Sequence, residues 1–563
     1  MSVPPLKNLY HINFGLSSII APILIRLKLL ADHFTEKFKG QNGIDLEPFT
    51  TSQSALNKPI SPAEVTLGIG KLNSNRAAGP ENIPAEYLKA TSHIIAPQLA
   101  NIFNSCFEDK EDLDINVGNL ILLPKPGKPP GPISNLRPIV LLSVFRKILS
   151  TITLTRVRQK IENYLSASQA GFRPNRSTTD IVFAHKFLIA RILKFQESYT
   201  ILGIDLSSAF DTIDREKLID ILKDIVDSDE LSLIRFLLAN TNLNISCGTE
   251  TTQIKTDIGT PQGDSLSPLL FIVYLEAALR DLRPKLPTST RFQPCELVYA
   301  DDFDLVFDTE QEARDSVPII VETFGRWNLK VNASKTEFTT VNRNSSEWYK
   351  TRKLGSLLND GKDIDRRKQL ASAAFANFKS LWISRNKTIQ EDKLLGLYNS
   401  LVLPILTYNS GTWSPTKSQA NKLDSFHRTQ LRRLLGIHWP NIISNSDLYK
   451  RCNCRPISES LPRQRLQLLG HIIRRPQNIP ARLAIQGYFS PNDSPKFRGR
   501  PPSNIVSTLN NDITLATASK IPQTDHGYCK KSELSLKNLS DLRNVEAAAE
   551  NRDYWKSFTK RMS

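Results

Sequence analysis

Three aspartates have the spacing to bind metal ions. Asp301 and Asp302 are adjacent, and apolar side chains alternate with a period of two on both sides of them, which predicts a tight hairpin with the acids at its turn. A third acid, Asp205, follows the apolar run 199–204, which predicts a buried strand. Two-metal phosphoryl transfer requires several hard oxygen ligands held about 4 Å around a pair of divalent ions, and these three carboxylates would supply them.

Carboxylates packed this closely repel one another or take up protons unless cations neutralise them. Bound magnesium is therefore part of the predicted site. Asp301 and Asp302 alone are more typical of a solvated hairpin than of a metal site, so the metal site depends on Asp205. Two further acids, Asp211 and Asp214, fall on the helix predicted to follow, and we interpret them as a helix cap and part of a solvated face.

Two kinds of element must position the three acids. The strand predicted at 199–204 presents Asp205 at its end, and the hairpin presents the other two at its tip. Beyond Asp205 the apolar residues recur at helical spacing, and Ser207 and Ser208 are candidate caps of that helix.

The composition predicts a multi-domain protein with a polyanionic partner. Its 563 residues suffice for about four domain-sized units. The net charge of +17 indicates nucleic acid first and an anionic membrane surface second. The apolar run 16–27 is too short for a membrane span and predicts an amphipathic helix. Scattered cysteines indicate a reducing compartment, and we interpret Cys452 and Cys454 as free thiols rather than zinc ligands.

Three segments carry a family resemblance. In chain order they are Ile-Asp-Leu-Ser-Ser-Ala-Phe-Asp (204–211), Gly-Thr-Pro-Gln-Gly-Asp-Ser-Leu-Ser-Pro (259–268) and Tyr-Ala-Asp-Asp (299–302). They resemble the palm motifs of reverse transcriptases from non-LTR (LINE-like) retrotransposons, and the basic C-terminal region resembles the tail of RTE-type elements.

The resemblance implies an α+β right-hand polymerase with fingers, a palm built on an antiparallel sheet and a helical thumb, followed by a basic and mainly helical C-terminal region. We expect an N-terminal helical extension and linker at 1–60, fingers and palm at 61–345, a thumb at 346–445 and the basic region at 446–563. The start of the second part, Ser61-Pro62-Ala63-Glu64, is typical of a capped helix.

The resemblance also implies roles for single residues. Asp205, Asp301 and Asp302 would be catalytic and would hold two Mg²⁺ ions, with Mn²⁺ as the alternative metal. The expected nucleotide-binding residues are Lys125, Arg137, Phe210, Gln262, Gly263 and Lys335. The expected template- and primer-binding residues are Arg173, Arg176 and Tyr299.

Each role outside the acids has a structural alternative. Lys125 and Arg137 would neutralise the triphosphate, or be solvated loop cations. Lys335 would steady the pyrophosphate leaving group, or be a solvated lysine. Arg173 and Arg176 would bind template phosphates, or hold the fingers together internally.

Two more residues concern the incoming nucleotide. Phe210 would lie under the sugar and exclude a 2′-hydroxyl, which favours deoxynucleotides, and core packing is the alternative. Gln262 and Gly263 belong to a loop whose glycine lets the backbone approach a ligand closely.

The predicted function is RNA-directed DNA polymerase, with an RNA template, a DNA primer or target and dNTPs as partners, no membrane and no obligate protein partner. A catalytically inactive nucleic-acid-binding remnant is the alternative, and Phe210 disfavours an RNA-templated RNA polymerase. We expect an intracellular protein, nuclear or cytoplasmic. Residues 1–60 are too short for the endonuclease domain that such elements usually carry upstream, so we expect that domain to be missing.

Overall fold

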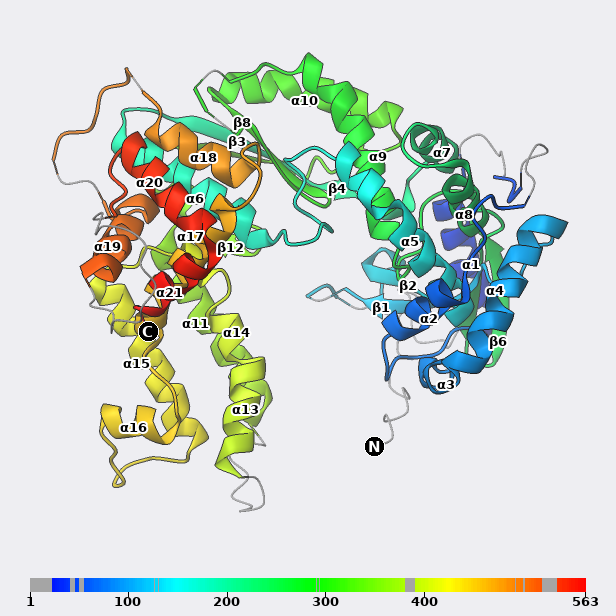
Figure 1. Ribbon diagram of the computed structural model, residues 1–563, viewed down its shortest axis with the longest axis horizontal. Helices are drawn as coiled ribbons and strands as arrows, with labels where there is room; N and C mark the ends of the chain where they lie inside the picture. Colours follow the sequence, from blue (N-terminus) through cyan, green and yellow to red (C-terminus); the bar gives the residue numbers. More distant parts are fainter. Residues whose placement is uncertain are drawn as a thin grey trace. The chain divides into compact units, whose positions relative to one another are not determined.

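The structure, a computed structural model, divides into two compact units. Unit 1 comprises Met1–Ser166, Leu206–Leu286 and Pro318–Asn332, and unit 2 comprises Ala167–Asp205, Pro287–Val317 and Ala333–Ser563. Both units combine helices with sheet strands, which confirms the α+β class (Figure 1). The residues that the structure describes are 23–40, 46–49, 55–125, 127–129, 131–289, 291–292, 294–379, 390–491, 493–499, 502–518 and 534–562.

Unit 1 contains a four-stranded mixed sheet with the order β2-β1-β5-β6. Strand β1 (Val117–Pro124) pairs antiparallel with β2 (Leu136–Leu142) and parallel with β5 (Asn242–Cys247), which continues antiparallel into β6 (Glu250–Lys255). The N-terminal helix α1 (Ile23–Phe38) packs on β5 and β6. Its apolar stripe shares one hydrophobic core with the sheet through Leu27, Leu30, Phe34 and Phe38.

The N-terminal helix was expected at 16–27, with the helical pattern continuing over 30–38, and 16–22 lie outside the described residues. Within the described part the helix runs to Phe38 as predicted, because apolar residues keep recurring at i, i+3 and i+4 spacing. Of the expected linker, 41–45 and 50–54 are also outside the described residues.

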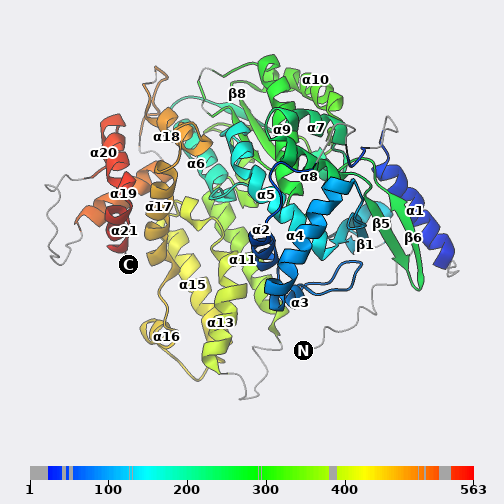
Figure 2. The same ribbon diagram turned by 45° about the vertical axis from the view of Figure 1, so that its right-hand side comes forward.

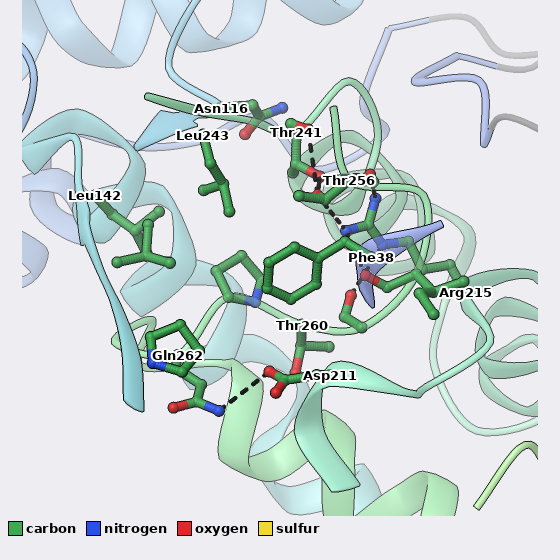
Figure 3. A pocket seen from close by; sticks show the side chains of 15 residues that line it. Phe38, Asn116, Leu142, Asp211, Arg215, Thr241, Leu243, Thr256, Thr260 and Gln262 are labelled. Atoms are coloured by element: carbon green, nitrogen blue, oxygen red, sulfur yellow. Dashed lines mark hydrogen bonds between the residues drawn. The ribbon is translucent and has the colours of Figure 1, made fainter. Parts of the chain in front are cut away.

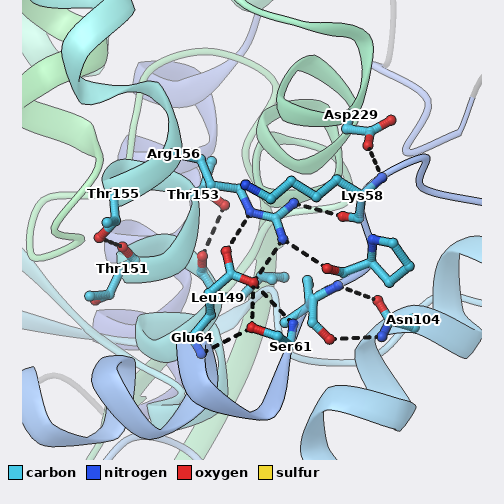
Figure 4. Close-up of polar contacts among 12 residues, drawn as sticks. Lys58, Ser61, Glu64, Asn104, Leu149, Thr151, Thr153, Thr155, Arg156 and Asp229 are labelled. Carbon is cyan, nitrogen blue, oxygen red and sulfur yellow. Dashed lines mark hydrogen bonds and ion pairs between the residues drawn. The ribbon is translucent and has the colours of Figure 1, made fainter.

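The first helix after the expected linker begins where the sequence predicted. Helix α2 (Pro62–Lys71) starts with a capping box in which Ser61 and Glu64 bond to each other's backbone N–H groups. Arg156, from α5 (Val144–Tyr164), donates to Glu64 and to the carbonyls of Lys58 and Pro59 (Figure 4). Burial would raise the pKa of Glu64, but the bonds from Arg156 and Ser61 outweigh it and lower that pKa to about 2.

Unit 1 is completed by further helices that carry short, mostly buried apolar faces. These are α3 (Ala85–Ala90), α4 (Ser92–Asp109), α7 (Arg215–Lys223), α8 (Ser228–Leu238) and α9 (Ser267–Leu282).

Unit 2 is built on a four-stranded antiparallel sheet with the order β10-β3-β8-β7. The strands are β3 (Tyr199–Ile204), β7 (Glu296–Tyr299), β8 (Asp302–Phe307) and β10 (Glu337–Val341). Every residue of β3 is buried, which explains why this strand reads as a continuous apolar run. Helix α6 (Thr178–Lys194) shares a hydrophobic core with this sheet and is itself buried from Asp180 to Ile192.

The C-terminal helices of unit 2 pack on one another and enter the same core as α6 (Figures 1 and 2). They are α17 (Ile457–Ile473), α18 (Pro480–Phe489), α19 (Ile505–Ala518), α20 (Leu539–Glu550) and α21 (Arg552–Lys560). Trp555 of α21 is buried and donates its indole N–H to the carbonyl of Leu466 at 2.8 Å. The basic region is therefore continuous with the hydrophobic core of the antiparallel sheet.

A separate hydrophobic core of unit 2 joins α11 (Asp360–Asn377), α13 (Glu391–Leu401), α15 (Lys417–Leu434) and α16 (Asn445–Arg451). His427 is buried in this core, where Tyr398 bonds to its Nδ1, and burial lowers the pKa of the imidazole to about 4. The cysteines of the described residues, Cys452 and Cys454 among them, are free thiols, while Cys529 lies outside those residues. Within the described ranges, none of the helices has both the length and the apolar character needed to cross a membrane.

Candidate active site

Strand pairing in unit 2 places the three predicted acids at neighbouring strand ends, on one end of the sheet. Strand β3 pairs antiparallel with β8 up to Ile204, which is opposite Phe303, so Asp205 follows directly where β8 begins with Asp302. Strand β7 pairs with β8 so that Tyr299 is opposite Asp302. Asp205, Asp301 and Asp302 therefore lie on adjacent strand ends of the same unit, as predicted.

The hairpin turns one residue earlier than predicted. Ala300 and Asp301 form the turn, and Asp302 is already the first residue of β8. Ala300 has φ +57°, a left-handed conformation that hairpin turns require and that alanine rarely adopts. The prediction that both acids occupy the turn was wrong, because alanine gave no sequence signal for a positive φ.

A neighbouring segment holds this strained turn in place. Gln169 accepts hydrogen bonds from the backbone N–H groups of Ala300 at 2.9 Å and Gly171 at 2.7 Å. Ala170 donates its N–H to the carbonyl of Val298 at 2.8 Å, so the segment runs beside β7. A Cβ at Gly171 would overlap the backbone nitrogen of Ala300. The sequence analysis assigned no role to Gln169, which lies two residues before Gly171.

The two arginines of that segment bond to backbone. Arg173 donates to the carbonyl of Gln169 at 3.1 Å, and Arg176 donates to the carbonyl of Ala167 at 3.0 Å. These contacts favour the internal structural role over template binding, two alternatives that the sequence left open. Tyr299 is half-buried beside the core of unit 2, and burial raises its pKa.

The acids impede one another's ionisation. Desolvation, followed by the charge of Asp205, raises the pKa of Asp301. Desolvation, together with the charges of Asp301, Asp304 and Asp205, raises the pKa of Asp302 to about 6. Lys335 forms an ion pair with Asp205, at 3.0 and 3.1 Å from its two oxygens. A lysine expected at the leaving group thus bonds to one of the acids.

A buried ion pair lies two residues beyond the hairpin acids. The Lys353 ammonium is 2.6 Å from Oδ1 of Asp304, and Nε2 of His185 is 3.0 Å from Oδ2. Burial would raise the pKa of Asp304, but Lys353 and His185 outweigh it and lower that pKa. Sequence reasoning missed this cluster, since Asp304 is an acid within a strand that otherwise alternates regularly.

The chemistry of the donor set fits divalent ions. Three carboxylates lie on adjacent strand ends, where burial, and after it the charges of neighbouring acids, raises the pKa values of Asp301 and Asp302. In the part of the chain that the structure describes, no three His, Cys, Asp or Glu side chains are arranged closely enough to hold a metal as they stand.

The expected nucleotide residues other than Lys335 belong to unit 1. Lys125 is exposed and donates to the carbonyl of Ser134 at 2.7 Å, while Arg137 is exposed on β2 opposite Leu123. Phe210 is half-buried and stacks on Phe271 of α9, with the ring centroids 4.5 Å apart.

The loop that contains Gln262 and Gly263 is fixed to strand β2. The carbonyl of Gln262 accepts from the N–H of Val140 at 3.0 Å. Gly263 has φ +122°, and a Cβ there would lie 2.7 Å from the carbonyl oxygen of Val140. Glycine is therefore required by the close approach of the strand.

Asp211 corrects the sequence interpretation. It is buried rather than solvated, forms an ion pair with Lys37 of α1 at 2.7 Å, and accepts a hydrogen bond from the Gln262 side chain at 3.1 Å. It lines a small cavity of unit 1 whose wall also includes Phe38 and Arg215 (Figure 3). Local sequence patterns could not predict this ion pair, because Lys37 lies far from Asp211 along the chain.

The other helix-start predictions had mixed outcomes. Asp214 is the N-cap of α7, where it accepts from the N–H of Lys217 at 3.1 Å, as a cap was predicted to do. Ser207 lies in the two-residue strand β4 (Leu206–Ser207), and Ser208 precedes a short 3-10 turn without a side-chain bond. Neither serine caps the helix, because the chain makes that turn before the helix begins.

The sequence family described as reverse transcriptase (RNA-dependent DNA polymerase) matches residues 123–376. The chain is 23% identical over 460 residues to a probable RNA-directed DNA polymerase from transposon X-element of Drosophila melanogaster, covering 75% of this chain and 50% of that protein. It is 22% identical over 420 residues to the RNA-directed DNA polymerase from mobile element jockey of Drosophila funebris, covering 68% of this chain and 44% of that protein.

A third relative is the retrovirus-related Pol polyprotein from type-1 retrotransposable element R2 of Popillia japonica, 24% identical over 347 residues, covering 56% of this chain and 47% of that protein. The chain spans about half the length of these curated relatives. A solved telomerase from Candida tropicalis matches with a TM-score of 0.36 at 14% identity over 71% of this chain and 62% of that one, a similarity too low to bear on the fold.

The matched range contains all three acids together with the hairpin and the strand that position them. Residues 123–376 thus match the reverse transcriptase family, and the chain is similar to RNA-directed DNA polymerases of non-LTR retrotransposons.

Proposed function

We propose that this chain extends the 3′-hydroxyl of a primer with deoxynucleotides on an RNA template. The observation that carries the proposal is the position of Asp205, Asp301 and Asp302 on adjacent strand ends within the range that matches the reverse transcriptase family. Its partners would be an RNA template, a DNA primer or target and dNTPs, and it would act inside the cell, in the nucleus or cytoplasm. Membership of the RTE type stays a prediction.

Asp205, Asp301 and Asp302 would hold two Mg²⁺ ions, or Mn²⁺ in their place. When bound, the ions would activate the primer hydroxyl and offset charge on the departing pyrophosphate. Asp301 and Asp302 must be ionised to act as ligands, and burial together with the neighbouring acids opposes this in the metal-free protein by raising their pKa values. Lys335 offsets the charge of the third acid through its ion pair with Asp205.

Residues of unit 1 are proposed to bind the nucleotide. Lys125, which follows β1, and Arg137 on β2 are exposed cations that suit phosphate oxygens. Phe210 presents a ring whose stacking on Phe271 leaves it half-exposed, as a group that selects against a 2′-hydroxyl requires. Gln262 and Gly263 form the loop that would face template and nucleotide.

The decisive experiment is primer extension on an RNA template with Mg²⁺, comparing dNTPs with rNTPs. Asp301→Asn should abolish DNA synthesis while RNA binding persists, because it removes a metal ligand without changing the shape of the turn. Asp392→Asn, an exposed acid on α13, is the matched control. Normal extension by Asp301→Asn would refute the site, extension with rNTPs would indicate an RNA polymerase, and RNA binding without extension by the wild type would indicate an inactive remnant.

A further inference from the structure

The connection between α15 and α16, Gly436–Ile443, displays two large apolar side chains to solvent. Trp439 is 91% exposed and Ile442 is 93% exposed. Among the exposed large hydrophobic residues in the described ranges, these two have the greatest exposure. A tryptophan and an isoleucine left in water three residues apart indicate a surface that is covered by a partner.

The connection has a defined shape. Gly436 ends α15 in a left-handed conformation, with φ +66°, and the N–H of Ile437 donates to the carbonyl of Arg432 at 2.9 Å. A turn follows, in which Asn441 donates to the carbonyl of His438 at 2.8 Å. These bonds order the segment on both sides of Trp439.

The far end of the connection is anchored as well. The guanidinium of Arg432 donates to the carbonyl of Ile443 at 3.3 Å and to the side chain of Asn445 at 2.8 Å. Ile437 and Ile443, at the two ends of the connection, pack against the core of α11, α13, α15 and α16. Trp439 and Ile442, in the middle of the connection, are exposed to solvent instead.

The surroundings of the connection are strongly basic. Residues 417–455 contain eight lysines and arginines but only two aspartates. One of the two, Asp424, is buried and accepts hydrogen bonds from Ser458, so it adds little negative charge to the surface. The exposed cations nearest to the connection along the chain are Arg433 at the end of α15 and Lys450 at the end of α16.

An open groove continues from the same helix. Its lining includes Tyr449, Lys450, Asn453, Arg455 and Glu459. An aromatic ring, two cations and an amide along one groove are the groups that bind a polynucleotide backbone and its bases. The connection lies at the end of α15 that points away from the sheet of unit 2 (Figures 1 and 2).

We propose that Gly436–Ile443 binds a single-stranded stretch of nucleic acid, with an unpaired base stacked on Trp439 and phosphates held by Arg433 and Lys450. The proposal deepens the proposed function, since a polymerase on an RNA template must hold unpaired template. Two apolar side chains offer too little area for a helix-like insertion into a lipid interface, whereas stacking requires one ring. An excess of cations excludes a basic protein partner.

The test measures binding of a fluorescein-labelled single-stranded 20-nucleotide RNA by fluorescence anisotropy at several salt concentrations. Trp439→Ala should weaken binding about 5- to 100-fold, the usual effect of losing one base stack, with the salt dependence unchanged. Trp439→Phe should restore most of the affinity. Arg433→Gln and Lys450→Gln should each weaken binding and reduce the salt slope by about 1.

Tyr554→Ala, an exposed aromatic on α21, is the control and should bind RNA as the wild type does. Because Trp439 is almost fully exposed, its variants should keep the wild-type circular dichroism. Unchanged RNA affinity in Trp439→Ala, or no RNA binding by the wild type, would overturn the proposal. So would a Trp439-dependent association with vesicles of phosphatidylcholine and phosphatidylserine, or with a second copy in sedimentation, when RNA affinity is unchanged.

The experiment requires no catalysis. If primer extension fails but Trp439→Ala still loses affinity, the binding surface stands and the polymerase activity does not. If extension succeeds and Trp439→Ala binds normally, only the binding surface is refuted.

Discussion

Replacing Lys353 by methionine tests whether the ion pair behind the acids stabilises unit 2. Lys353 and Asp304 are 2.6 Å apart, and both side chains are about nine-tenths buried, at 9% and 11% exposure. Methionine fills nearly the same volume but leaves the Asp304 carboxylate with His185 as its remaining partner in that cluster. Removing one partner of a buried pair typically costs about 3–5 kcal/mol, because an uncompensated charge stays buried.

The retained bond to His185 places the expected loss at the lower end, about 3 kcal/mol of unfolding free energy. Urea-induced unfolding followed by tryptophan fluorescence measures it, with the m-value expected to stay constant. Lys350→Met, an exposed lysine three residues earlier, should change stability by less than about 0.5 kcal/mol. The double variant Lys353→Met/Asp304→Asn should recover at least about 1 kcal/mol, because the orphaned charge is then gone.

A stabilising role for the Lys353–Asp304 ion pair is refuted if Lys353→Met is as stable as Lys350→Met. It is also refuted if the loss of stability in the double variant equals the sum of the losses in the two single variants. A second readout concerns the acids themselves. Lys353 lowers the pKa of Asp302, so its removal should shift the onset of Mg²⁺ binding to higher pH. A purely structural role for Lys353 would leave that onset unchanged.

Two further predictions concern the hairpin. In the metal-free protein, Asp302 has a folded pKa of about 6 against about 4 when unfolded, so it contributes stability below pH 4 that is lost as the pH rises through 6. Asp302→Asn should flatten this part of the unfolding midpoint against pH, and Mg²⁺ should stabilise the wild type only above about pH 6; equal pH profiles would contradict the assignment. Gly171→Ala should cost about 1–3 kcal/mol in urea unfolding and reduce extension, because its Cβ overlaps the turn at Ala300. Gly325→Ala is its control, because a Cβ there would meet no atom within 4 Å. Equal stability of the two variants would contradict the prediction that the close contact between Gly171 and Ala300 holds the turn.

The sequence predicted the three acids because strand pairing follows from local patterns. A buried run before Asp205 and alternation around Asp301 both specify strands, and adjacent strands bring their ends together. The chain order of the three resembling segments indicated that these acids belong to one site. The position of the turn was missed since a positive φ at Ala300 depends on Gln169 and Gly171, which hold it from another part of the chain.

Buried charges were the main failure of the sequence interpretation. Asp211 looked like a surface residue of a helix start, yet its partner Lys37 comes from the N-terminal helix. Asp304 is 119 residues from His185 and 49 residues from Lys353. Local propensity carries no information about such pairs, because their partners are chosen by the tertiary fold rather than by spacing along an element.

The packing of α21 into the core of α6 and the antiparallel sheet imposes an order on protein synthesis. Helix α6 is synthesised long before Trp555. The apolar face that the C-terminal helices cover is therefore exposed to water until those helices have been translated. A nascent chain in that state invites chaperones and self-association. A nonsense mutation upstream of α21 would consequently leave a polymerase domain unable to close its own core, rather than one that merely lacks an appendage.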